Sequence, residues 1–84
     1  MGDLEGARGC FERALGIGEA VYGPDHPNVA TFVNNLGTVL RELGDLKGAR
    51  ECYERALGIC RRVYGEKHPK TQLVLRNLKA LGGD

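Results

Sequence analysis

Residues 2–27 read GDLEGARGCFERALGIGEAVYGPDHP, and residues 44–69 read GDLKGARECYERALGICRRVYGEKHP. Eighteen of the twenty-six aligned positions are identical, so the chain contains an internal repeat with a period of 42 residues. A period of this length is typical of a solenoid, in which each unit buries its apolar side against its neighbours. The remaining parts, 28–42 and 70–84, have diverged. The last element of the array is therefore expected to differ from the others.

The apolar residues recur at the three- and four-residue spacing of amphipathic helices. Glycine and proline mark the boundaries between the helical segments. Gly23 and Gly65 suit the left-handed position just past a helix end, and Pro27 and Pro69 suit the first turn of the next helix. Such short connections make consecutive helices antiparallel neighbours. We predict an all-α fold with helices over residues 4–22, 27–43, 46–64 and 69–81.

Two side-chain arrangements can be predicted from these helices. Gly37 has no Cβ, so it lets its helix approach a face made of the small residues Ala49 and Ala56. Glu51 and Arg55 lie four residues apart on the next helix, where an ion pair would stabilise it by about 0.2–0.5 kcal/mol.

The length of 84 residues allows one small domain, spanning 1–84 with repeat units of about 2–43 and 44–84. The net charge of +1 gives no electrostatic reason to expect a nucleic acid or an anionic membrane as a partner. No stretch approaches the ~18 consecutive apolar residues of a membrane span, and the N-terminus does not resemble a signal peptide. We therefore expect a cytoplasmic protein, unless the chain is a fragment that has lost a signal.

Cysteine and histidine are the only candidates for metal or redox chemistry. The three cysteines form no CxxC motif, and we expect reduced, buried thiols. His26 and His68 precede proline at equivalent positions, one repeat apart and without further ligands at metal-binding spacing. They are interpreted as helix caps. No catalytic constellation and no phosphate-binding loop is present, so we expect neither an enzyme nor a cofactor.

Two of the helix patterns resemble the tetratricopeptide repeat. VNNLGTVL at 33–40 carries Val-x-x-Leu-Gly-x-x-Leu, and ARECYERA at 49–56 carries Ala-x-x-x-Tyr-x-x-Ala. The 42-residue period is similar to the repeats of kinesin light chains and of many bacterial repeat proteins. The resemblance implies a right-handed solenoid of alternating A and B helices, here in the order B-A-B-A. It also implies a scaffold for protein–protein interaction.

In such repeats the A helices line a groove that binds peptides. The resemblance places seven polar residues of the two A helices there: Thr31, Asn34, Asn35, Thr38, Arg41, Arg76 and Asn77. Asparagine amides can bond an extended peptide backbone, and arginine can bind a carboxylate. Leu73 departs from the carboxylate-binding pattern of chaperone-binding relatives, which have a basic residue there. A solvated helix face would carry similar residues, so this alternative stays open.

The first helix lacks the A helix that would precede it in a longer array. Its uncovered apolar face predicts self-association, most simply as a two-fold dimer. Head-to-tail stacking is disfavoured because Lys79 replaces Gly37, as in a capping helix. A structural self-assembly unit, or a piece of a longer array with no ligand of its own, is the alternative function. The candidate contact residues are Leu4, Ala7, Phe11 and Ala14.

Overall fold

The computed structural model describes residues 3–82, and all regular structure in this range is helical. The predicted all-α fold is confirmed, and each helix ends within two residues of its predicted bound. Residues 1, 2, 83 and 84, at the limits of the predicted domain and repeat units, lie outside the described residues. The helices are α1 (Leu4–Tyr22), α2 (Pro27–Glu42), α3 (Leu46–Val63) and α4 (Pro69–Lys79).

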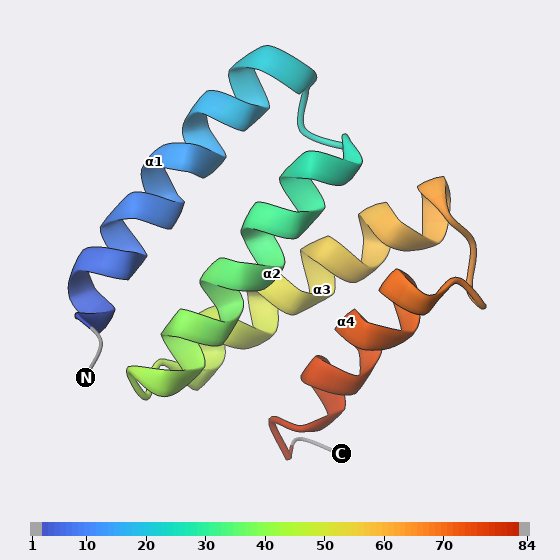
Figure 1. The fold of residues 1–84 in the computed structure, drawn as a ribbon. Helices are drawn as coiled ribbons and strands as arrows, with labels where there is room; N and C mark the ends of the chain where they lie inside the picture. Colours follow the sequence, from blue (N-terminus) through green and yellow to red (C-terminus); the bar gives the residue numbers. More distant parts are fainter. Residues whose placement is uncertain (1–2, 83–84) are drawn as a thin grey trace.

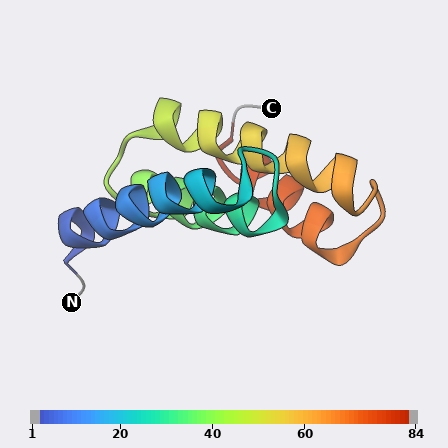
Figure 2. The ribbon, with the colours of Figure 1, turned by 90° about the horizontal axis from the view of Figure 1, so that it is seen from above.

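The helices pack in chain order as a flat stack (Figure 1). Helix α2 packs against α1 and α3, and α3 packs against α2 and α4. Seen from above, α3 lies on one side of the slab and α2 on the other (Figure 2). The slab measures 34 × 34 × 20 Å. Only the two inner helices, α2 and α3, therefore have a neighbour on both sides.

Each B-type helix, α1 and α3, begins at an aspartate cap. The carboxylate of Asp3 accepts a hydrogen bond from the backbone N–H of Gly6 at 2.9 Å, and Asp45 accepts one from Gly48 at the same distance. A Cβ added to Gly48 would lie 2.5 Å from Asp45 Oδ2. The glycine at the third helical position thus leaves room for the capping carboxylate, which explains a residue that helix propensity disfavours.

Each A-type helix, α2 and α4, begins at a histidine. The imidazole Nδ1 of His26 accepts a hydrogen bond from the Asn28 N–H at 3.0 Å, and His68 accepts one from Lys70 at 3.1 Å. The two rings also stack on the tyrosine four residues earlier, with centroids 4.5 Å apart at His26 and 4.2 Å apart at His68. The interpretation of both histidines as helix caps is therefore confirmed.

The core lies between α2 and α3. Tyr53 is its largest fully buried side chain, and its hydroxyl lies 2.8 Å from Oγ1 of Thr38. Gly37 does permit a close approach, but the predicted partners were wrong. A Cβ at Gly37 would lie 2.9 Å from Cε1 of Tyr53 and 3.1 Å from Cβ of Cys52, so the ring of the aromatic residue, rather than an alanine face, needs the space.

The cysteines do not share one environment. Cys60 is buried and Cys52 is half-buried, but Cys10 is exposed, so the prediction of a buried thiol was wrong at Cys10. Cys10 is the repeat equivalent of Cys52, which faces α2 near Gly37. No described helix occupies the corresponding position beside α1, and this difference exposes Cys10.

Candidate functional site

The described residues enclose a groove between α2, α4 and the end of α3, with a volume of about 230 Å³. This α2–α4 groove is smaller than the roughly 300–1000 Å³ typical of small-molecule sites. A space of this size fits an inserted side chain better than a cofactor. Its lining residues are Pro27, Ala30, Thr31, Asn34, Asn35, Cys60, Tyr64, Lys70, Leu73 and Val74.

The α2–α4 groove combines an apolar floor with a polar rim. Ala30, Cys60 and Val74 are buried, whereas Leu73 leaves 45% of its surface exposed. Burial raises the pKa of the Cys60 thiol, and the Lys70 ammonium has a smaller effect that lowers the pKa. The thiol therefore stays protonated near neutral pH, and the floor carries no charge.

One cation stands at the rim of the α2–α4 groove. The ammonium of Lys70 lies 5.5 Å from the centroid of the Tyr64 ring, within the range of a cation–π contact. The same ring stacks on His68, the cap of α4. The Tyr64 ring thus holds Lys70 in place at the start of α4. There the ammonium can meet an anionic group that enters the groove.

Three of the seven residues predicted from the resemblance line this groove: Thr31, Asn34 and Asn35. Asn34 Oδ1 accepts a hydrogen bond from Nδ2 of Asn77 at 3.1 Å, which ties α2 to α4. Asn35 forms no side-chain hydrogen bond with any residue in the range 3–82. Its amide is therefore available to a ligand.

The other four predicted residues do not line the α2–α4 groove. The hydroxyl of Thr38 pairs with Tyr53 and also donates to the Asn34 carbonyl at 3.3 Å. Asn77 contributes its amide to Asn34. Arg41 is partly exposed and Arg76 is exposed, and neither borders the groove.

Sequence reasoning missed the apolar floor and the cation of the groove. Cys60 lies on a B-type helix, which the resemblance assigns to the outer layer, and Tyr64 caps the end of that helix, so the resemblance places neither residue in the groove. A usable signal was the spacing of Cys60 and Tyr64, which places both on the side of α3 that faces the following helix. Lys70 lies directly after the His-Pro start of α4, close to that end of α3.

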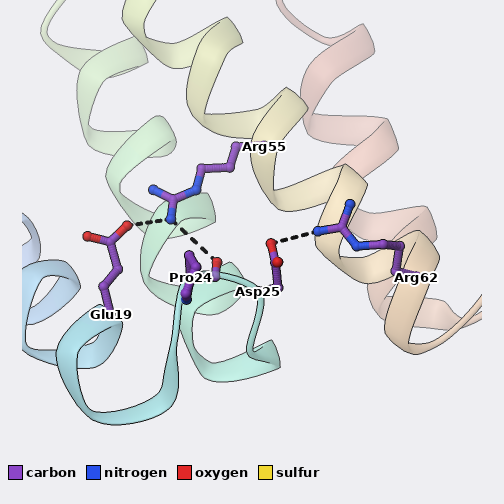
Figure 3. Close-up of polar contacts among 5 residues, drawn as sticks. All are labelled: Glu19, Pro24, Asp25, Arg55 and Arg62. Carbon is purple, nitrogen blue, oxygen red and sulfur yellow. Dashed lines mark hydrogen bonds and ion pairs between the residues drawn. The ribbon is translucent and has the colours of Figure 1, made fainter.

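A second polar arrangement joins consecutive hairpins (Figure 3). Arg55 on α3 forms an ion pair with Glu19 on α1 and donates to the Pro24 carbonyl at 3.4 Å. Arg62 on α3 forms an ion pair with Asp25 at 2.7 Å. The predicted pair of Arg55 with Glu51 was wrong, because Arg55 reaches across to the preceding hairpin instead.

The outer side of α1 presents apolar side chains that are more exposed than their equivalents on α3. Ile17 is 61% exposed, whereas its equivalent Ile59 is 1% exposed. Val21 is 68% exposed, and its equivalent Val63 is 46% exposed. The difference arises because α3 packs on two helices and α1 packs only on α2.

The four residues predicted for self-association lie along α1. Leu4, Ala7, Phe11 and Ala14 are all partly exposed. Phe11 packs against the core cluster, so it is turned toward α2. The most exposed apolar residues, Ile17 and Val21, lie further along the helix than the prediction placed them.

Other kinds of site can be checked within the same range. No three His, Cys, Asp or Glu side chains among residues 3–82 come together as metal ligands. Each helix described here is too short or too polar to cross a lipid bilayer.

The stacked hairpins and the groove between successive A-type helices define a helical-repeat protein. Two family models, both described as tetratricopeptide repeat, match residues 29–70 and 1–49. The chain belongs to the tetratricopeptide repeat family, and the model matched to residues 29–70 is of the kinesin-light-chain type. This family supports a role in protein–protein interaction and is generally not catalytic. No curated protein matches the chain.

Proposed function

We propose that the chain is a non-enzymatic interaction module that binds an extended peptide segment of another protein in the α2–α4 groove. The observation that carries the proposal is the combination of an apolar floor, the free amide of Asn35 and the ammonium of Lys70 around one small groove. An extended peptide offers the matching groups: one apolar side chain, backbone N–H and C=O groups, and a carboxylate.

The charges around the groove favour an acidic peptide. From Arg61 to Lys79 the chain carries six basic residues and one acidic residue, Glu66. Arg61 pairs with Glu66 and Arg62 pairs with Asp25, which leaves Lys70, the basic residue that lines the groove, to attract an anionic ligand. The preferred ligand is thus a segment with one apolar side chain next to an aspartate or glutamate.

The test is a peptide-array screen followed by fluorescence anisotropy on the best sequences. Asn35→Ala and Lys70→Glu should each weaken binding about tenfold or more, the equivalent of roughly 1.4 kcal/mol. Glu54→Ala, at an exposed position of α3 outside the groove, is the control and should leave binding unchanged. Equal binding by wild type and both groove variants would refute the proposal.

A second proposed function is self-association through the uncovered side of α1. The observation that favours it is the contrast between exposed Ile17 and buried Ile59, because the sequence keeps isoleucine at both positions. Exposed apolar residues of this kind drive association in water. Sedimentation equilibrium tests this function: a monomer at millimolar concentration would exclude it.

A further inference from the structure

The uncovered side of α1 has the spacing of a helix-packing seam. Its residues follow one another at alternating steps of three and four positions. Two of them, Ile17 and Val21, are large apolar side chains that are mostly exposed to water. Among the α3 equivalents, Ala49, Ala56 and Ile59 are buried and Cys52 lies beside Gly37 of α2, whereas Val63 is 46% exposed. We call this set the α1 seam: Ala7, Cys10, Ala14, Ile17 and Val21.

Another copy could in principle cover the α1 seam with α4, the helix that would precede α1 in a head-to-tail stack. Two observations exclude that arrangement. Lys79 stands at the position of Gly37, where even a Cβ would lie 2.9 Å from the ring of Tyr53. The equivalent of Tyr53 on α1 is Phe11. A lysine side chain would therefore collide with the incoming Phe11.

The ion pairs between hairpins give the second observation. In the chain, Arg55 meets Glu19 of the preceding hairpin. Arg13 is the repeat equivalent of Arg55, and Arg61 is the equivalent of Glu19. In a head-to-tail stack Arg13 would thus face Arg61 of the other copy, and like charges at this position oppose the contact.

We propose that the α1 seam packs against the α1 seam of a second copy, in antiparallel orientation about a two-fold axis. This inference rests on the proposed self-association. The heptad spacing divides the seam into two sets, one of Ala7, Ala14 and Val21 and one of Cys10 and Ile17. In an antiparallel pair, each layer joins a residue of one set to a residue of the other set on the second copy. Ala14 then meets Ile17 of the other copy, and Cys10 meets Val21. Each layer combines a small side chain with a large one, which is how close-packed interfaces fill space.

The flank of the seam fits the same arrangement. Beside the seam lie Arg13 and Ala20, and in the antiparallel register they fall opposite one another across the axis. Ala20 is the repeat equivalent of Arg62, the α3 arginine that pairs with Asp25 in the loop between α1 and α2. Alanine at this position of α1 removes the like charge that Arg13 would otherwise meet.

Sedimentation equilibrium from micromolar to millimolar concentration tests the stoichiometry. The expected result is a dimer that gains no further mass. Val21→Glu should abolish the dimer, whereas Val63→Glu, the same change at the repeat-equivalent site of α3, should leave it intact. Mass that rises beyond the dimer would refute the two-fold seam while leaving self-association in place. A monomer at all concentrations would refute self-association itself.

Cysteine cross-linking tests the orientation. Val21→Cys should give a covalent dimer on mild oxidation, with peptide mapping showing a bond from Cys10 of one copy to residue 21 of the other. The two thiols cannot join within one chain, because eleven helical residues separate them by about 16 Å. A bond between the two Cys10 residues of the wild-type dimer would instead mean parallel helices and would overturn the proposal.

Discussion

The hydroxyl groups of Thr38 and Tyr53 lie 2.8 Å apart and join α2 to α3 inside the core. Tyr53 is fully buried, so Thr38 supplies the partner that its hydroxyl cannot obtain from water. Thr38→Val would leave this hydroxyl without that partner, and we expect a loss of about 1–3 kcal/mol in the free energy of unfolding. Urea denaturation measures the loss.

The double variant Thr38→Val with Tyr53→Phe is the matched control for that change. It removes both hydroxyl groups, so no buried polar atom is stranded, and it should be more stable than Thr38→Val alone. A double variant less stable than Thr38→Val would show that the hydroxyl pair does not explain the loss.

Glycine-to-alanine substitutions should have opposite effects at two helical positions. Gly37→Ala would place a Cβ against Tyr53 and Cys52, and we expect a destabilisation of about 1–3 kcal/mol. Gly16→Ala meets no atom within 4 Å and should stabilise by about 0.5–1 kcal/mol, because alanine favours the helix. Thermal unfolding of both variants checks the signs, and a stabilised Gly37→Ala would contradict the packing of α2 on α3.

The pair Glu19–Arg55 should contribute little to stability at ordinary salt. Both side chains are more than a third exposed, and exposed ion pairs typically give about 0.2–1 kcal/mol. A double-mutant cycle with Glu19→Gln and Arg55→Gln measures the coupling energy. The coupling should vanish at about 1 M salt, where the Debye length falls to about 3 Å. Coupling that persists there would indicate a hydrogen bond shielded from solvent.

The cap of α4 can be separated from its aromatic stack by two substitutions at His68. His68→Ala removes both the acceptor for the Lys70 N–H and the stack on Tyr64, and should cost about 1–2 kcal/mol. His68→Asn keeps a capping acceptor and should cost less. Chemical denaturation compares them, and equal losses would mean that the stack, rather than the cap, stabilises this end of α4.

The three thiols should react with an alkylating reagent in a fixed order. Cys10 is exposed and should react first. Burial raises the pKa of Cys52, with a further contribution from Glu51, and burial also raises the pKa of Cys60. A raised pKa lowers the thiolate fraction at a given pH, so both should react more slowly and should accelerate only at higher pH. Mass spectrometry at several times gives the order, and early alkylation of Cys60 would contradict the closed floor of the groove.

Local patterns were enough to predict the helices and their caps. Gly23 and Gly65 both adopt a positive φ of 91°, which favours glycine, but ψ of 162° at Gly23 lies outside the left-handed helical region that was predicted for it. His26 and His68 cap helices because the His-Pro sequence combines an acceptor with a proline that needs no backbone partner. These features depend on residues close in sequence, which a repeat displays twice.

Contacts between helices could not be predicted in the same way. Arg55 had two possible carboxylate partners, and only the stacking of hairpins brings Glu19 within reach. The groove was partly missed because Tyr64 and Lys70 meet at a corner between two helices, and spacing along α3 does not show which residue of α4 lies beside Tyr64. Cys10 was misplaced because its exposure depends on a helix that would precede α1 in a longer array.

The flat, ordered stacking has a consequence for how the protein opens. Helices α2 and α3 each pack closely on two helices, whereas α1 and α4 each pack closely on one and reach another only through polar side-chain contacts. In a linear array, the protection of backbone amides from hydrogen exchange increases from the end units to the central ones. Amide hydrogens of the central hairpin should therefore exchange last, and a ligand that clamps α4 onto α2 would slow exchange in the last helix without touching the first.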